Sequence, residues 1–147
     1  MNAKACLLKR PITVALAGFG FLLAAHSAHA ATYTVTNTND AGVGSLRDAI
    51  AQANTNPGAD TIVFSGVTGT IALASGALQI TDSVTITGPG AGSLSVSGNN
   101  VSGVFELSGS GTNVTTISDL SIVNGSASIG AGIVIGAMYA VGSLLVN

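Results

Sequence analysis

The side chains of this sequence that could carry out chemistry are mainly carboxylates. Two carboxylates held close together can act as a general acid and as a base or nucleophile, the arrangement that cleaves glycosidic bonds. After residue 30 the acids are Asp40, Asp48, Asp60, Asp82, Glu106 and Asp119. They are scattered along the chain, so such chemistry would require the fold to bring Asp82, Glu106 and Asp119 to one solvent-exposed face.

The same acids have a simpler interpretation as turn residues. Four of them, Asp40, Asp60, Asp82 and Asp119, stand beside Asn, Ser, Thr or Ala at the expected ends of strands. An aspartate in that setting most often accepts hydrogen bonds from backbone N–H groups of its own turn. We therefore expect structural roles for these carboxylates and predict no catalytic residue.

Arg47 is the only basic residue after residue 30. A catalytic arginine needs an acid–base partner, and none is visible for a side chain on the outer face of a helix. We expect Arg47 to pair with Asp48 or Asp60, or to donate hydrogen bonds to free backbone carbonyls. Cys6 and both histidines, His26 and His29, precede residue 31. The sequence after residue 30 therefore excludes zinc sites and the usual nucleophile triads.

Oxygen ligands for calcium are available at Asn37, Asn39 and Asp40, but the chain contains no Asp-x-Asp-x-Asp-Gly loop and no Gly-Gly-x-Gly-x-Asp repeat. Calcium is thus a weak alternative, and no metal or cofactor residue is predicted. The pair Asn99-Asn100 and Asn124 lie at expected turns. Left-handed turn residues, inward asparagine ladders and a polar face that contacts glycans are all compatible with them.

The first thirty residues have the pattern of a secretory signal peptide. Three basic residues lie in the first ten positions, an uncharged apolar run covers Ile12–Ala25, and Ala28-His29-Ala30 is a small-x-small cleavage site. The mature chain would begin at Ala31. An uncleaved membrane anchor is the alternative, but the apolar run is short for crossing roughly 30 Å of hydrocarbon.

Removal of the signal peptide would leave one basic residue against six acidic residues, a formal charge of 1 − 6 = −5. Nucleic-acid binding needs several lysines and arginines to displace the counterions of phosphates. The composition therefore argues against a nucleic-acid partner. The mature chain would contain no cysteine, so packing and backbone hydrogen bonds have to hold it together.

One helix is predicted, over residues 45–54. Ser45 and Asp48 have the spacing of a helix N-cap, and the apolar residues Leu46, Ala49, Ile50 and Ala53 follow at helical spacing. The run Asn-Thr-Asn-Pro-Gly after it should end the helix near Asn54. Short strands rich in Val, Ile, Leu and Thr are predicted at 32–36, 61–64, 70–73, 78–80, 84–87, 94–97 and 104–107.

These elements resemble a known architecture. The run TVTNTNDAGVGSLRDAIAQAN, followed by GADTIVF, IAL, LQITDSVTITGPG and LSVSGNN, is similar to the N-terminal region of bacterial surface-exposed right-handed parallel β-helix proteins. That group, which includes autotransporter passengers and polymorphic outer membrane proteins, carries a Cys-Ser-Leu-Arg-Glu-Ala type motif. Gly44 stands here in place of the cysteine and Asp48 in place of the glutamate. The resemblance covers about Thr32 to Gly132 and implies a fold rather than an activity.

The predicted fold class is accordingly all-β, a right-handed parallel β-helix fragment with a short N-terminal capping helix. Alternation predicts inward pairs at Ile71 and Leu73, Leu78 and Ile80, Val84 and Ile86, Leu94 and Val96, Phe105 and Leu107, and Leu120 and Ile122. Ser83–Thr87 and Asp119–Val123 match in their apolar positions at an offset of 36, which we interpret as about two turns of a solenoid. An antiparallel β-sandwich is the competing fold.

The last part of the chain allows two interpretations. Residues Ile129–Val146 are uncharged, and Gly132 and Gly136 have the small-xxx-small spacing of packed membrane helices. Against a membrane helix, the segment is rich in glycine and lacks flanking basic residues. We favour one more turn of the coil, ending in Leu144-Leu145-Val146.

The predicted organisation is a signal peptide over 1–30, a cap over 31–64 and the first turns of a β-helix over 65–147. We expect a secreted or bacterial cell-surface protein, a non-catalytic scaffold for adhesion or display with glycans or a host surface as partners. A polysaccharide lyase or glycoside hydrolase of the pectin-degrading type is the alternative. The small number of turns suggests a truncated piece of a longer product, with outer-membrane association through a region outside this chain.

Overall fold

The computed structural model describes residues 28–109, 112–126, 132–135 and 143–146. Nearly all of the predicted signal peptide lies outside these residues. Within them the chain forms one helix and eleven short strands, and every strand pairing is parallel. The competing prediction of an antiparallel β-sandwich is therefore wrong.

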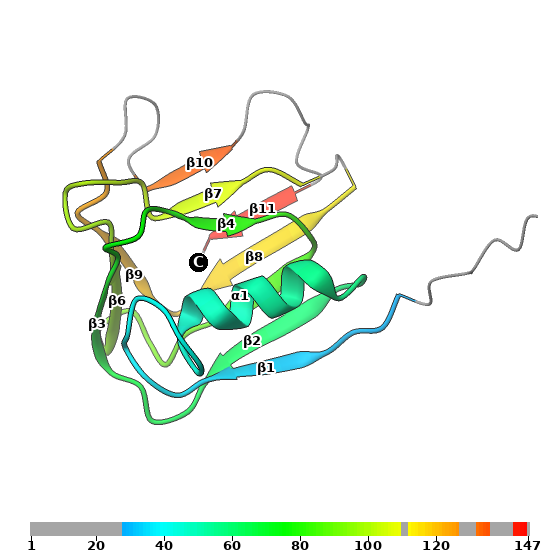
Figure 1. Ribbon diagram of the computed structural model, residues 1–147, viewed down its shortest axis with the longest axis horizontal. Helices are drawn as coiled ribbons and strands as arrows, with labels where there is room; N and C mark the ends of the chain where they lie inside the picture. The colour runs from blue at the N-terminus through cyan, green and yellow to red at the C-terminus, as the bar shows by residue number, and fades with distance from the viewer. Residues whose placement is uncertain (1–27, 110–111, 127–131, 136–142, 147) are drawn as a thin grey trace, which may run out of the picture.

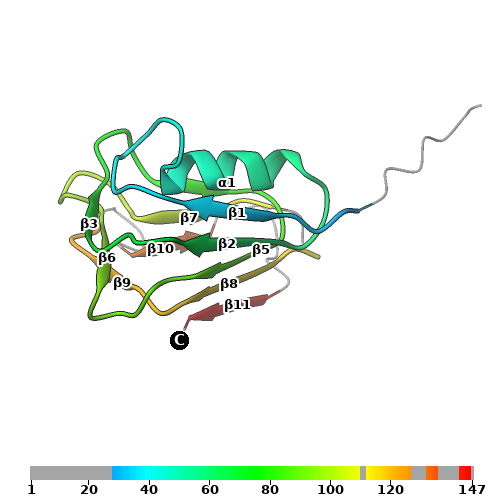
Figure 2. The ribbon, with the colours of Figure 1, turned by 90° about the horizontal axis from the view of Figure 1, so that it is seen from below.

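Three parallel sheets form the sides of the coil (Figures 1 and 2). We call them sheets A, B and C. Sheet A contains, in spatial order, β1 (Thr32–Val35), β2 (Asp60–Phe64), β5 (Val84–Thr87), β8 (Val114–Ser118) and β11 (Ser143–Val146). Sheet B contains β3 (Gly69–Ala72), β6 (Leu94–Ser97) and β9 (Ser121–Val123). Sheet C contains β4 (Leu78–Ile80), β7 (Phe105–Leu107) and β10 (Ile133–Ile135).

The chain visits sheets A, B and C in turn and then returns to sheet A one strand further along. This path is a parallel β-solenoid of about four turns, which confirms the predicted fold class. Neighbouring turns supply each other's hydrogen-bond partners, so no turn is stable by itself. Among the described strands, the two end strands of each sheet pair on one side only: β1 and β11 in sheet A, β3 and β9 in sheet B, and β4 and β10 in sheet C.

The length of a turn varies along the coil. Asp60 lies beside Val84, and Val84 lies beside Thr115, so the second of these turns takes more residues than the first. The interpretation of the offset of 36 as about two turns is therefore wrong, because two successive turns run from Asp60 to Thr115, a much larger offset. Ser83–Thr87 stacks on residues 114–118 of the same sheet, whereas the matching residues 119–123 lead into β9 of sheet B.

The core is a column of aliphatic side chains enclosed by the three sheets. Ten of the predicted inward residues are at most 2 % exposed: Ile71, Leu73, Leu78, Ile80, Val84, Ile86, Leu94, Val96, Phe105 and Leu107. Leu120 is also buried, whereas Ile122 is only partly buried. The sequence reading missed β8, where Thr115 and Ile117 point inward, because a threonine at an inward position hides the apolar alternation.

The helix α1 (Leu46–Thr55) closes the first end of the coil (Figure 2). It follows β1 and packs against β1, β2 and β4, so β1 and α1 together cover the first complete turn. The predicted apolar stripe of Leu46, Ala49, Ile50 and Ala53 is buried.

The ends of α1 differ slightly from the prediction. The helix begins one residue after Ser45 and ends at Thr55 rather than Asn54. Its C-cap, Asn56, has extended backbone angles instead of a left-handed conformation.

Ser45 caps the helix as predicted, since its Oγ accepts a hydrogen bond from the Asp48 N–H at 3.1 Å. The Asp48 carboxylate in turn accepts from the Gly44 N–H at 3.3 Å, one residue before the partner of a standard capping box. Gly44 has φ +76°, and a Cβ there would overlap the Thr36 hydroxyl. Glycine is thus matched to the local geometry at position 44.

The described part of residues 129–146 continues the coil. β10 pairs in parallel with β7, and β11 pairs in parallel with β8. The prediction of a further turn is confirmed for these strands, and they are not part of a membrane helix. Among the described residues, no helix has the length and apolar character needed to cross a bilayer.

Candidate functional site

A groove of about 490 Å³ lies between the cap helix and sheet C. Its wall on the helix side is formed by Arg47, Ile50, Ala51 and Asn54, and its opposite wall is formed by residues 75–79 and Glu106. Glu106 is in the middle of β7 and points outward, because its neighbours Phe105 and Leu107 are buried. The groove is where a ligand of this end of the coil would be expected to bind.

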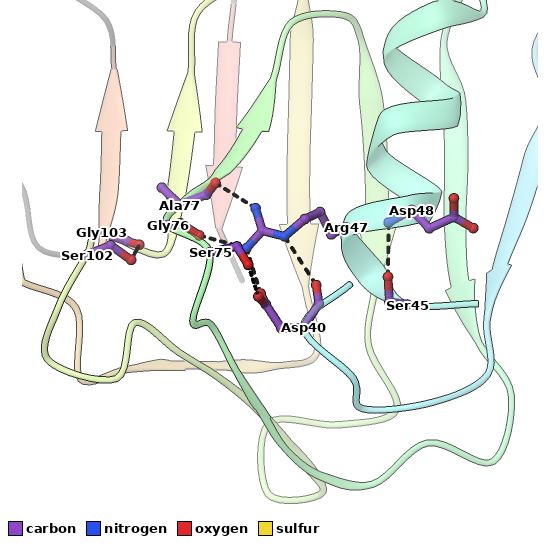
Figure 3. Close-up of polar contacts among 9 residues, drawn as sticks. All are labelled: Asp40, Ser45, Arg47, Asp48, Ser75, Gly76, Ala77, Ser102 and Gly103. Atoms are coloured by element: carbon purple, nitrogen blue, oxygen red, sulfur yellow. Dashed lines mark hydrogen bonds and ion pairs between the residues drawn. The ribbon is translucent and has the colours of Figure 1, made fainter. Parts of the chain in front are cut away.

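Arg47 is held along this groove by a set of hydrogen bonds (Figure 3). Nη2 donates to Asp40 Oδ1 and to the Gly76 carbonyl, both at 2.7 Å. Nη1 donates to the Ala77 carbonyl at 3.1 Å and Nε to the Asp40 carbonyl at 3.2 Å. Four of the five guanidinium N–H groups are thus used. Arg47 joins the cap helix to the loop before it and to the turn between β3 and β4.

The partner of Arg47 is therefore Asp40, and not Asp48 or Asp60 as predicted. The prediction that Arg47 bonds free carbonyls is confirmed by Gly76 and Ala77. Asp40 was expected to accept from its own turn, but its Oδ2 accepts from the Ser75 hydroxyl, 35 residues away. The ion pair is mostly shielded from solvent, with 24 % of the Arg47 side chain and 16 % of the Asp40 side chain exposed.

These contacts change the pKa of Asp40. Burial raises its pKa, but the hydrogen bonds from Ser75 and Arg47 and the charge of Arg47 together outweigh burial. The pKa of Asp40 therefore lies below its ordinary value. The charged form is the one that the folded protein stabilises.

Asn54 fastens the other end of the helix to the coil. Its Nδ2 donates to the Gln79 carbonyl at 2.8 Å, and its Oδ1 accepts from the Thr81 N–H at 2.9 Å. The side chain thereby pairs with the backbone at the end of β4. We did not anticipate this role, because the sequence shows only that asparagine suits a helix end. The two most polar groups on the helix side of the groove, Arg47 and Asn54, are thus committed to internal bonds.

Asp82, Glu106 and Asp119 do not come together on one face. Asp82 lies at the corner from sheet C to sheet A, Glu106 lies on sheet C one turn later, and Asp119 lies at the corner from sheet A to sheet B after β8. The described residues also contain no group of three or more Asp, Glu, His or Cys side chains able to hold a metal ion. Of the calcium candidates, Asn37 Oδ1 accepts from the Asn39 N–H, and both Asp40 oxygens are used as above.

The corner residues have the local geometry expected of turns. Asp82 accepts from the Ser83 N–H at 2.7 Å, as predicted. Asn99, Asn100, Asp119 and Asn124 all have left-handed backbone angles, with φ between 49° and 59°. This confirms the turn interpretation of the asparagines, and since all three are exposed they do not form an inward ladder. Contact with glycans stays a prediction.

Asp60 is the exception among the acids, because it is 1 % exposed. Its Oδ1 accepts from the Ala31 backbone N–H and from Asn56 Nδ2, both at 2.8 Å. Its Oδ2 is buried without a hydrogen-bond partner. The expectation that Asp60 accepts from its own turn is therefore wrong: its backbone donor lies 29 residues earlier.

The outer face of sheet A carries two rows of side chains, rich in hydroxyl groups, in register. One row contains Thr32, Thr61, Thr85 and Thr116. The other contains Thr34, Val63, Thr87 and Ser118. Parallel strands place such residues about 4.8 Å apart across the sheet and the rows about 6.6 Å apart along it. The result is a set of uncharged positions in which seven of the eight side chains carry a hydroxyl group and Val63 is the exception.

Comparison with known proteins finds no relative of this chain. No protein-family model, curated protein or solved structure matches the chain. The resemblance to surface-exposed β-helix proteins therefore stays a prediction, and function has to be argued from the described residues.

Proposed function

We propose that this chain is an exported, non-catalytic β-solenoid that presents the outer face of sheet A for adhesion to glycans or a host surface. The observation that carries the proposal is the register of the two hydroxyl rows. Threonine and serine can donate and accept hydrogen bonds, as sugar hydroxyls do, and a glycan does not require a charged partner. Outer-membrane association would come from a region outside this chain.

The stiffness of the scaffold supports the same function. Each strand of sheet A is fixed by backbone pairing on both sides, except at the two ends of the coil. The hydroxyl groups are thus held in place before a ligand arrives, which reduces the entropy lost on binding. A single contact of this kind is weak, so we expect binding to extended polymers rather than to short sugars.

The proposal is tested by measuring how the protein binds a panel of immobilised neutral and acidic polysaccharides. Thr85→Val combined with Thr116→Val removes two adjacent hydroxyls of one row while preserving side-chain shape and strand propensity. Thr70→Val, at an exposed position of β3 in sheet B, is the matched control. We expect at least tenfold weaker binding in the double variant and unchanged binding in the control. Equal binding by all three proteins would exclude the face of sheet A.

The enzymatic alternative is a polysaccharide lyase or glycoside hydrolase that uses the groove beside Glu106. The groove favours it, whereas the internal bonds of Arg47 and the separation of Asp82, Glu106 and Asp119 do not. The same polysaccharides in solution, assayed for new reducing ends or unsaturated products, decide between the two. If the unmodified sequence turns over a polysaccharide and Glu106→Gln does not, the protein is an enzyme and the proposal of a non-catalytic scaffold is wrong.

A further inference from the structure

The carboxylate of Asp60 is buried beside the predicted cleavage site, and among the described residues no cation lies against it. Both of its donors, the Ala31 amide and the Asn56 side chain, are neutral. The ion pair of the described residues is the one between Arg47 and Asp40. A buried carboxylate without a counter-charge is unfavourable, and an oxygen without any donor adds to that cost.

We propose that cleavage between Ala30 and Ala31 supplies the missing cation, because the Ala31 nitrogen becomes an α-ammonium that pairs with Asp60. This inference rests on the proposed export of the chain. An endopeptidase that accepts small residues at Ala28 and Ala30 adds water across the Ala30–Ala31 peptide bond. The carbonyl carbon of Ala30 takes the hydroxyl group, the Ala31 nitrogen takes the proton, and the resulting amine binds a second proton near neutral pH.

Ala31 is also held by contacts that cleavage would keep. Its carbonyl accepts from the Thr61 N–H at 2.8 Å, and the next residue, Thr32, is in register with Thr61 in sheet A. Cleavage would therefore keep the Ala31 nitrogen near Asp60 Oδ1, to which it donates at 2.8 Å in the uncleaved chain. An amide nitrogen has one N–H, whereas an ammonium has three. The additional donors are available to the oxygen that has no partner, Asp60 Oδ2.

Residues 28–30 make contacts that cleavage would release. The His29 N–H donates to the Pro57 carbonyl at 2.8 Å, and the His29 carbonyl accepts from Asn56 Nδ2. All three residues are exposed. Asn56 also binds Asp60 and forms the C-cap of α1. After cleavage its amide retains Asp60 as a partner, so the new ion pair would join β1, β2 and the end of the cap helix.

The pair couples processing to stability. Before cleavage one oxygen of the buried Asp60 carboxyl has no hydrogen-bond partner, and after cleavage the ammonium would supply one and strengthen the contact between β1 and β2. An exported chain would thus reach full stability only once its leader has been removed. Such an order is useful for a protein that has to remain unfolded until it crosses a membrane.

The experiment uses the fact that no lysine follows Lys9. Residues 31–147, which retain every described helix and strand, are released from a cleavable tag with a free Ala31 amine. Acylation with an acetyl ester at neutral pH then modifies that amine and removes its charge. We expect acetylation to lower the melting temperature by about 5 °C. In Asp60→Asn the same treatment should change it by less than about 1 °C, and in the control Asp82→Asn it should act as in the unmodified sequence.

Equal effects of acetylation in the unmodified sequence and in Asp60→Asn would overturn the ion pair. If Asp60→Asn does not fold, a chain that begins at Ala30 replaces it, because one extra residue returns the Ala31 nitrogen to an amide. The melting temperature of that chain should equal that of the acetylated protein. A melting temperature equal to that of the free-amine protein would overturn the ion pair.

Export is measured separately, by expressing the full chain in a Gram-negative host and weighing the periplasmic product. A mass that begins at Ala31 supports processing at the proposed bond, and a mass that begins elsewhere overturns it. An unprocessed cytoplasmic product would refute the export proposal, while the acetylation result on residues 31–147 would still decide whether the Ala31 amine and Asp60 interact.

Discussion

Replacing Arg47 with methionine removes the guanidinium that joins the cap helix to two other segments but keeps a stem of similar length. Four hydrogen bonds are lost, and one of them is to a carboxylate. All four have the charged guanidinium as donor, and hydrogen bonds that involve a charged group contribute about 1.5–3 kcal/mol each. Because both side chains are partly exposed and water can replace some bonds, we expect a net loss of about 2–3 kcal/mol of unfolding free energy.

The assay is urea denaturation of residues 31–147 followed by circular dichroism, for Arg47→Met, Asp40→Asn and the double variant. A coupling energy of about 1–2 kcal/mol between the two sites is expected, because they share a bond. Arg47→Lys is the matched control: it keeps the charge but loses the fork that reaches Gly76, Ala77 and Asp40 together, so it should fall between Arg47→Met and the unmodified sequence.

Acid provides a second readout of the same ion pair. The folded pKa of Asp40 lies below its ordinary value of 3.8, so its contribution is fully present above that pH. The contribution is lost as pH falls through the lowered folded pKa. The difference in stability between the unmodified sequence and Asp40→Asn should be constant above about pH 5 and shrink below pH 3.8. A loss of unfolding free energy under about 0.5 kcal/mol in Arg47→Met, or additive effects in the double variant, would show that the ion pair does not stabilise the cap.

Two further substitutions test the coil and its cap. Gly88→Ala would place a Cβ against the backbone of Asp119 on the next turn and should lower the unfolding free energy by about 2–3 kcal/mol. The control Gly92→Ala, where the space around the residue is open, should change the unfolding free energy by under about 0.5 kcal/mol. Equal effects of the two in urea denaturation would contradict the described stacking. Leu46→Ala empties a fully buried site under the cap helix and should cost about 2–5 kcal/mol in the same assay, against under about 0.5 kcal/mol for Val43→Ala, where the side chain is 93 % exposed.

Local patterns in the sequence were sufficient to predict the cap helix and most strands. Ser45 and Asp48 mark a helix start through bonds within one turn of chain, and the alternation of Val84 and Ile86 reports burial within one strand. These features depend on neighbours a few residues away. That is why the helix and the inward pairs could be predicted before the fold was known.

Relations between distant segments could not be predicted in the same way. The corner loops differ in length, so the turn from Asp60 to Val84 is shorter than the turn from Val84 to Thr115, and the offset of 36 was misleading. Arg47 finds Asp40 and the carbonyls after Ser75 only when the coil brings three segments together. Asp60 looked like a turn residue because nothing in its vicinity shows that its carboxylate turns inward to a donor 29 residues earlier.

Our main conclusion is that consecutive turns stack in parallel with the stated register, since the sheet A face, the cap and the Asp60 site all depend on it. Residues 31–147 contain no cysteine, so paired cysteines test the claim by disulfide formation. Thr85→Cys with Thr116→Cys occupies directly neighbouring positions, at a spacing that a disulfide can bridge. Thr85→Cys with Ser121→Cys joins the positions related by the offset of 36. We expect rapid oxidation of the first pair and none of the second within the monomer, and the reverse result would overturn the parallel stacking.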